Sequence, residues 1–275
     1  VAVVMSWLLL PLLLLLLVFS YRYGWWLPAV DYRRPRILMY HMVCDHEPGQ
    51  QFKGLRVPPA MFERQIRHLA ETGWHFVTMT ELMTRHDLPE KTIAITFDDG
   101  YEDNYSQAYP VLKKYNAKAT LYLVVDRHDR DWSVNKKAHH NTGELAREPK
   151  VSDAQLREML DSGVFELGAH TLTHVNLKTA ASHDKQREIL EGRTQLEQQF
   201  STRVTSFAYP FGIYGPDDVA LAQEAGFLSA VTTVDGIDAD IHAHPFELKR
   251  VKISGKDNFL AFRLRLRIGK RGWKK

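Results

Sequence analysis

The stretch Ile93-Ala94-Ile95-Thr96-Phe97-Asp98-Asp99-Gly100 decides how the rest of the chain is interpreted. Its alternating apolar residues predict a buried β-strand that ends at two adjacent carboxylates. Adjacent strand residues point to opposite faces, so Asp98 and Asp99 can share one site only if the backbone bends, and Gly100 permits that bend. An acidic turn or a helix cap explains the three residues Asp-Asp-Gly equally well when they are taken alone.

Strands and helices alternate along the chain on both sides of this stretch. That alternation predicts an α/β fold in which parallel strands are joined by crossover helices. Carboxylates at the C-terminal end of such a strand lie where α/β barrels place their chemistry. Periodicity alone is compatible with a barrel and with a doubly wound sheet. The expected strands are 37–43, 75–78, 93–97, 119–125, 165–169, 205–209, 228–233 and 248–253.

The composition of the chain limits the kinds of partner and metal site that the protein can have. The 275 residues include 36 basic and 33 acidic side chains, and a formal net charge of +3 is too small to indicate a nucleic-acid partner. Cys44 is the single cysteine, which excludes an internal disulfide and a multi-cysteine metal site. A bound metal would therefore be held by histidine, aspartate or glutamate.

Residues 1–20 predict a transmembrane anchor. The run from Val1 to Phe19 has no charged residue, and about 20 apolar residues span a bilayer as a helix. Aromatic residues between Tyr21 and Trp26 follow it, as at a membrane interface. A cleaved signal peptide is the alternative, but no basic segment precedes the run and no small-residue cleavage site follows it. We therefore expect a single-pass protein of a bacterial inner membrane, with the bilayer as a partner.

Charge suggests an orientation and the domain limits. Arginines follow the apolar run and none precedes it, so the positive-inside rule favours a cytoplasmic C-terminal domain. We expect an anchor at 1–20, a juxtamembrane linker at 21–35, one catalytic domain at 36–256 and a basic amphipathic tail at 257–275. That tail is compatible with contact to anionic lipid and with a solvated terminus.

A second motif, His170-Thr171-Leu172-Thr173-His174, directly follows the strand expected at 165–169. Histidines four residues apart lie on one face of a helical turn, so both imidazoles can reach one ion. Parallel strands bring this motif and the acid pair to the same edge. One carboxylate with two histidines is a recurring site for a divalent metal, and the second acid is then available as a base.

Together, Thr96-Phe97-Asp98-Asp99-Gly100 and His170-Thr171-Leu172-Thr173-His174 resemble the motifs of the polysaccharide deacetylases, the NodB-type domains of carbohydrate esterase family 4. Phe207-Ala208-Tyr209-Pro210-Phe211-Gly212 resembles that family's groove-wall motif, in the form found in the branch of poly-β-1,6-N-acetylglucosamine deacetylases. The resemblance covers about residues 37–253. It implies a distorted (β/α) barrel and metal-dependent removal of N-acetyl groups from amino sugars of an envelope or extracellular polysaccharide, or of its lipid-linked precursor.

The resemblance also implies residue roles. Asp98 would be the general base, and the metal with a backbone N–H near Phe211 would hold the oxyanion. One divalent ion, zinc or else cobalt, nickel or iron, would be bound. The expected metal ligands are Asp99, His170 and His174, and the expected substrate contacts are Tyr209, Pro210 and Phe211.

Two departures from the family pattern concern catalysis. The groove motif usually begins with an arginine, where this chain has Ala208, and the late Leu-x-His that supplies the general acid has no match. His41, at an expected strand end, is the preferred candidate for the acid, with His242 and His244 as alternatives. A catalytically impaired, membrane-tethered glycan-binding protein is the alternative function. The intact acid pair and histidine pair argue against it.

Overall fold

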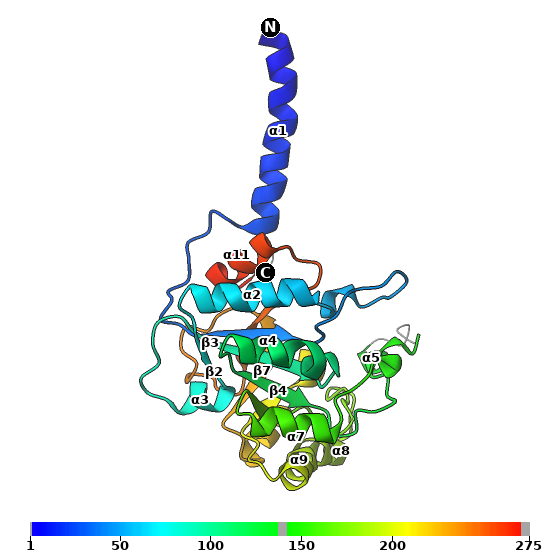
Figure 1. Ribbon diagram of the computed structural model, residues 1–275. Helices are drawn as coiled ribbons and strands as arrows, with labels where there is room; N and C mark the ends of the chain where they lie inside the picture. Colours follow the sequence, from blue (N-terminus) through cyan, green and yellow to red (C-terminus); the bar gives the residue numbers. More distant parts are fainter. Residues whose placement is uncertain (1, 137–141, 271–275) are drawn as a thin grey trace.

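Within residues 2–136 and 142–270, which the computed structural model describes, seven parallel strands close into a barrel (Figure 1). The side chains of residues 2–8 lie outside that description. The sheet closes because β1 pairs with β8 on one edge and with β3 on the other. The predicted distorted (β/α) barrel is therefore confirmed. The strands are β1 (Arg36–Tyr40), β3 (Thr92–Asp99), β4 (Ala119–Leu123), β5 (Phe165–Ala169), β6 (Ser206–Ala208), β7 (Ser229–Asp235) and β8 (Leu248–Lys252).

An eighth strand distorts the barrel. β2 (His75–Val77) pairs with the first residues of β3, Thr92 to Ala94, and β4 pairs with the remainder, Ile95 to Asp99. Two strands thus share one edge of β3. The C-terminal half of β3, which carries the acid pair, remains within the closed ring.

The alternation within β3 places one acid inside the barrel. Ile95 and Phe97 belong to the main hydrophobic core between the strands and the outer helices, where Phe97 packs against the ring of Tyr40 at 5.5 Å. Thr96 and Asp98 occupy the opposite face and contact an arginine side chain of β8 inside the barrel. The apolar face is the main source of stability, because each fully buried large side chain contributes about 1.5–3 kcal/mol.

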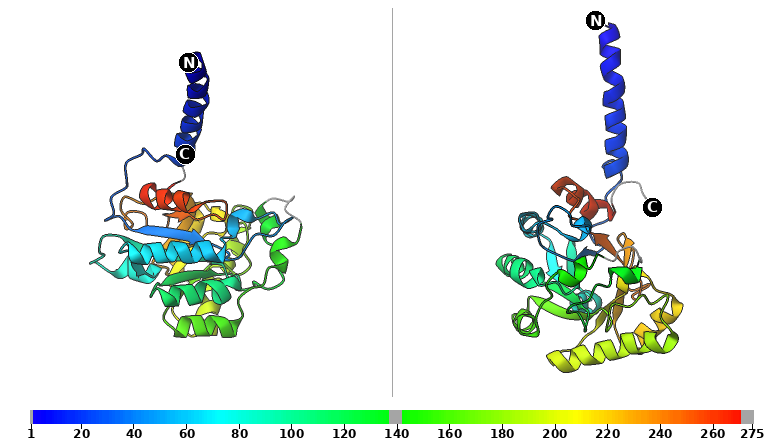
Figure 2. Two further views of the ribbon diagram at one scale, coloured as in Figure 1. Left: turned by 45° about the horizontal axis from the view of Figure 1, so that its top comes forward. Right: turned by 90° about the vertical axis from the view of Figure 1, so that its right-hand side faces the viewer.

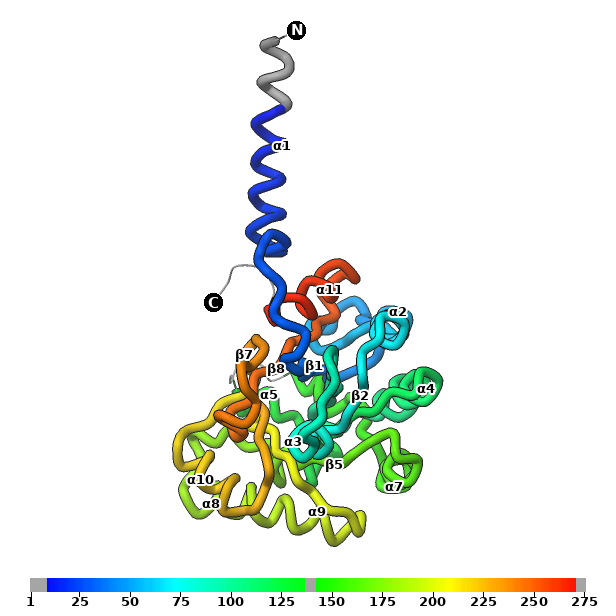
Figure 3. Tube along the Cα trace, turned by 90° about the vertical axis from the view of Figure 1, so that its left-hand side faces the viewer, coloured from blue at the N-terminus to red at the C-terminus, as the bar shows by residue number. Residues whose placement is uncertain are grey.

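Helices cover the outside of the barrel. Figure 3 shows α2, α4 and α7 along one side and α8, α9 and α10 along another, and Figure 1 shows α5 at the mouth. The helices are α1 (Ala2–Tyr23), α2 (Pro59–Glu71), α3 (Met79–Thr84), α4 (Tyr109–Lys114), α5 (Ser133–Lys136), α6 (Glu144–Arg147), α7 (Asp153–Asp161), α8 (Ser182–Gln186), α9 (Gly192–Phe200), α10 (Pro216–Glu224) and α11 (Phe259–Ile268). Short helical turns lie at η1 (Lys53–Leu55), η2 (Asn104–Ala108), η3 (Arg187–Glu191) and η4 (Pro210–Gly212).

The predicted membrane anchor is not supported. The helix α1 projects away from the barrel (Figure 2), with exposed leucines from Leu9 to Leu17. In the part of the chain that the structure describes, no helix has both the length and the apolar character needed to cross a membrane. The single-pass inner-membrane location, and with it the orientation from the charge bias, is therefore withdrawn.

The C-terminal segment is part of the folded domain as far as residue 270. Phe262 and Leu266 of α11 lie in the main core, and Arg265 forms ion pairs with Asp235 and Asp257. The last five residues of the predicted basic tail, 271–275, lie outside the described residues.

Candidate metal centre and active site

Three predicted metal ligands converge at the C-terminal mouth of the barrel. The Oδ1 atom of Asp99 lies 3.4 Å from Nε2 of His170 and 3.2 Å from Nε2 of His174. One ligand atom from each of the three residues lies within 4.8 Å of the other two, and all three residues are buried. Burial alone would raise the pKa of the Asp99 carboxyl, but the two imidazoles beside it hold that pKa well below its usual value.

The backbone around this cluster is strained where the ligands turn inward. Asp99 has a φ of 79°, Thr171 of 66° and His174 of 57°. Non-glycine residues in this left-handed region are uncommon and accumulate at functional sites. The predicted bend after the acid pair is therefore present, and it begins at Asp99 itself. At Gly100, with a φ of 84°, a Cβ atom would lie 2.4 Å from a methyl group of Leu123, so this position requires glycine.

The histidine motif differs locally from its prediction. His170 to His174 form an irregular turn after β5, not a helical turn. The left-handed conformations of Thr171 and His174 bring both rings to Asp99, so the two histidines meet by a different route. His174 donates its backbone N–H to the Thr171 hydroxyl, which closes the turn.

The two imidazoles are oriented in different ways. Nδ1 of His170 lies 2.7 Å from the carbonyl oxygen of Ala208, so its Nε2 faces the cluster. Nδ1 of His174 is buried without a hydrogen-bond partner among the described residues. Its ring packs instead against Trp132, with centroids 4.9 Å apart, and edge-on to Phe211 at 4.3 Å. Burial lowers the pKa of His174, which favours the neutral imidazole that binds a metal ion.

The second acid, Asp98, faces a different set of groups. Arg250 on β8 donates two hydrogen bonds to its carboxylate, at 2.7 and 2.8 Å, and is fully buried. Nε2 of His41, after β1, lies 3.9 Å from Oδ2 of Asp98. Burial alone would raise the pKa of the Asp98 carboxyl, but the Arg250 guanidinium outweighs it and holds that pKa below its usual value. Burial also lowers the pKa of the His41 imidazole.

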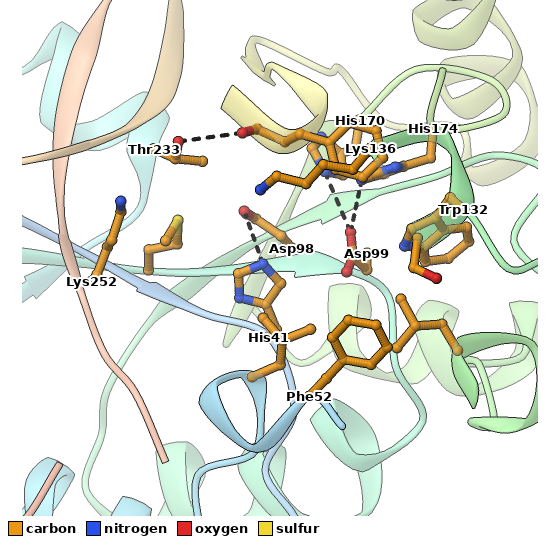
Figure 4. Close-up of a pocket in the computed structure, with 15 residues that line it drawn as sticks. His41, Phe52, Asp98, Asp99, Trp132, Lys136, His170, His174, Thr233 and Lys252 are labelled. Carbon is orange, nitrogen blue, oxygen red and sulfur yellow. Dashed lines mark hydrogen bonds and ion pairs between the residues drawn. The ribbon is translucent and has the colours of Figure 1, made fainter. Parts of the chain in front are cut away.

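These groups open into a pocket of about 360 Å³ (Figure 4). The Asp99 group and the pair of Asp98 and His41 lie side by side on its floor. Its walls are mixed, with aromatic and aliphatic side chains interrupted by two lysines. The lining residues beyond the floor are Met39, Phe52, Leu55, Trp132, Ser133, Lys136, Leu145, Phe211, Thr233 and Lys252.

The expected substrate contacts separate into two groups. Phe211 lines the pocket, whereas Tyr209 and Pro210 are buried and do not. Tyr209 stacks on Tyr214 at 4.3 Å and donates its hydroxyl to the carbonyl oxygen of Phe246. Its position is that of a core residue supporting the turn that carries Phe211.

Of the three candidates for the general acid, His41 alone lines the pocket. His242 and His244 are exposed and lie outside its wall. Arg250 was not anticipated. It contacts the base candidate although the groove motif has Ala208 in the usual place of an arginine. The strand Leu248-Lys249-Arg250-Val251-Lys252 contains three cations, and only its alternation, with Leu248 and Arg250 on the interior face, would single out Arg250.

Comparison with known proteins agrees with this geometry. Residues 85–230 match the family model described as polysaccharide deacetylase. The YxkH protein of Bacillus subtilis (strain 168), whose name assigns it to the polysaccharide deacetylases, is 32% identical over 83% of this chain and 75% of its own length. A poly-β-1,6-N-acetyl-D-glucosamine N-deacetylase of Staphylococcus aureus (strain MRSA252) is 25% identical over 72% of this chain and 69% of its own length.

A solved structure shares the fold. The Streptococcus pyogenes deacetylase PplD, determined in complex with acetate, superposes with a TM-score of 0.68 at 26% identity. The match covers 83% of this chain and 94% of that protein. Family model, relative and structure thus lead to one assignment. The chain belongs to the polysaccharide deacetylase family, and it is an enzyme of the N-deacetylase class.

Proposed function

We propose that this enzyme removes N-acetyl groups from the amino sugars of an envelope or extracellular polysaccharide, or of its precursor, in a metal-dependent hydrolysis. The observation that carries the proposal is the buried group of Asp99, His170 and His174 beside the Asp98 carboxylate, at the floor of one open pocket. N-acetylglucosamine units of that glycan are the preferred site of deacetylation, by analogy with the sugar named for the S. aureus relative.

The residues fit a divalent metal ion. One carboxylate oxygen and two imidazole nitrogens face one another, and this donor set is typical of zinc and also suits cobalt, nickel or iron. Asp99, His170 and His174 would hold the ion, and positions toward the pocket would remain open. A bound ion there supplies Lewis-acid polarisation of the acetamide carbonyl and lowers the pKa of a water molecule that it binds.

Asp98 and His41 supply proton transfer in this proposal. Asp98 accepts a proton from the attacking water as general base, and Arg250 keeps the carboxylate charged and correctly oriented beforehand. His41, 3.9 Å from Asp98, is the group placed to protonate the departing amine of the sugar. Phe211 offers an apolar wall for a sugar ring next to the reacting group.

The test is acetate release from β-1,6- and β-1,4-linked N-acetylglucosamine oligomers by the full chain. The protein would be measured metal-stripped and after reconstitution with zinc or cobalt, beside Asp98→Asn and His170→Ala. We expect release only from the reconstituted wild type. The exposed His242→Ala serves as a control that should retain activity. Release that persists in the metal-stripped protein would refute metal dependence, and metal binding without release from any acetylated glycan would refute the deacetylase assignment.

A further inference from the structure

Two cations lie on the interior face of β8, one deep in the barrel and one at its mouth. Arg250 and Lys252 are two residues apart, so they share the interior face, and Val251 between them points outward into the main core. Arg250 lies deeper, on the Asp98 carboxylate, whereas Lys252 ends the strand at the pocket mouth. Its register partner on β1 is Met39, another residue of the pocket wall.

The acids near Lys252 are already paired with other cations. Asp98 is held by Arg250. Asp235 accepts the backbone N–H of Lys252 with one oxygen, but its other oxygen forms an ion pair with Arg265 at 3.2 Å. No carboxylate of the described residues forms an ion pair with the Lys252 ammonium within 4.0 Å. The ammonium thus faces the pocket without a counter-charge from that part of the chain.

The pocket has a second lysine on its other side. Lys136, at the end of α5, has its Nζ 5.8 Å from the centre of the Phe211 ring. Figure 4 shows Lys252 on the far side of Asp98 from Lys136. Arg250 neutralises Asp98, and Asp99 is the one other acid among the described lining residues, where it faces the two histidines and not Lys252.

A neutral glycan would cover Lys252 without neutralising it. Removing an ammonium group from water is costly unless a partner of opposite charge replaces the lost hydration. An anionic group on the ligand removes that cost, because it forms a charge-assisted hydrogen bond with the ammonium.

We propose that the physiological glycan carries an anionic substituent, a carboxylate or a phosphate, on or next to the sugar that is deacetylated, and that Lys252 binds it. The inference rests on the proposed function, because it assigns the substrate class of the same pocket. Lys252 then discriminates charged from neutral N-acetylated glycans.

The first experiment compares matched substrates with the wild-type, metal-reconstituted full chain. A β-1,4-linked N-acetylglucosamine hexamer is neutral, and a hexamer alternating with N-acetylmuramic acid differs from it by its lactyl carboxylates. The neutral hexamer with a reducing-end phosphate forms the third arm. We expect kcat/KM to be about tenfold or more higher for a charged substrate, as for a hydrogen bond to a charged group. The better of the two charged arms identifies the anion, and added salt should reduce its advantage.

The second experiment assigns the preference to Lys252. In Lys252→Met the ratio of charged to neutral kcat/KM should fall about tenfold, and Lys252→Arg should restore most of it. Lys249→Met removes the same charge from the outward face of the same strand, where the lysine pairs with Asp238, and should leave the ratio unchanged. Calorimetric binding of the same hexamers to metal-stripped protein should follow the same order.

The outcomes separate the two proposals. Release from the neutral hexamer that equals or exceeds release from both charged ones overturns the anionic substrate and leaves the deacetylase assignment intact. An equal loss on all substrates in Lys252→Met also overturns it, because the lysine would then serve the reaction in general. Failure of acetate release from every arm, with metal bound, overturns the proposed function itself.

Discussion

The two sides of the barrel mouth are built by opposite means. On the side of β3 and β5, the residues Asp99, His170 and His174 meet because the backbone leaves its strands in left-handed conformations. On the side of β8 and β1, Arg250 and Lys252 project from a regular strand, and His41 follows directly after β1. The first side collects the candidate metal ligands, and the second collects cations and the candidate general acid. Asp98 of β3 joins the two sides through its contacts with Arg250 and His41.

The strongest test of this difference between the two sides is to neutralise Asp98 and Asp99 separately. Asp98→Asn should reduce kcat by about 10²–10⁴-fold, the usual contribution of a general base, and should leave metal affinity largely intact. Asp99→Asn should abolish metal binding and activity together, because its Oδ1 faces both histidines. Metal titration by calorimetry and acetate release measure the two effects. Loss of metal binding in Asp98→Asn with retention in Asp99→Asn would reverse the assignment.

The ion pair between Arg250 of β8 and Asp98 of β3 connects the two sides, and it predicts an effect on stability. Arg250→Met leaves the Asp98 carboxylate buried and unpaired, which should lower the free energy of unfolding by about 3–5 kcal/mol at neutral pH. Since Arg250 holds the pKa of Asp98 below its unfolded value, the pair stabilises the protein above that value and the contribution is lost as the pH falls through the folded pKa. The difference between variant and wild type should therefore shrink toward acidic pH in urea unfolding.

A double variant controls for simple loss of packing. In Arg250→Met combined with Asp98→Asn, no buried charge remains, so part of the lost stability should return. Equal stability losses in the single and double variants would assign the effect to the arginine's packing rather than to the charge pair.

The fold could be predicted from the sequence because its signals are local. The alternation in Ile93-Ala94-Ile95-Thr96-Phe97 reappears as β3, and the strands expected at 119–125 and 165–169 reappear as β4 and β5. The prediction for the apolar N-terminal run rested on its length, its lack of charged residues and the aromatic residues after it, and it is contradicted. Among the described residues, no helix is both long enough and apolar enough to cross a membrane.

The site was predictable only on the side where its residues are contiguous in sequence. Asp98, Asp99, His170 and His174 stand in short motifs after predicted strands. Arg250 lies more than 150 residues from Asp98, and nothing in Lys249-Arg250-Val251-Lys252 indicates which cation faces an acid until the barrel closes. Trp132 lies in a stretch without periodicity, so its contact with His174 had no signal.

Trp132 provides a smaller effect on the metal side. His170 is oriented by a hydrogen bond to a carbonyl, whereas His174 depends on packing against this indole at 4.9 Å. Trp132→Leu should therefore weaken metal affinity by about 10–100-fold, as loss of an orienting partner does. Trp132→Phe, which keeps an aromatic face, should lose less. Unchanged affinity in the leucine variant would show that the irregular turn alone orients His174.

Lys150 predicts the smallest effect, a pH dependence of stability. Its ammonium is buried between the carbonyl oxygens of Leu145 and Glu148, to which it donates, and lies 5.0 Å from the centre of the Trp132 ring. Burial lowers the pKa of Lys150 to about 8. The unfolded chain, with an ordinary lysine pKa near 10.4, then binds more protons between the two values, so stability rises with pH in that window.

The comparison that isolates this contribution is urea unfolding of wild type and Lys150→Met at intervals from pH 7.5 to 9.5. The wild-type free energy of unfolding should rise relative to the variant, by at most about 1.4 kcal/mol per pH unit for one titrating group. Unpaired carbonyl groups in Lys150→Met change its free energy of unfolding by the same amount at every pH. The change of the wild-type-minus-variant difference with pH, and not the size of that difference, is therefore diagnostic. Lys256→Met, which removes an exposed lysine, should keep the wild-type slope. If the free energies of unfolding of wild type and Lys150→Met ran parallel with pH, Lys150 would have the same pKa in the folded and the unfolded chain. Lys150 would then not be a buried cation behind the metal side of the pocket.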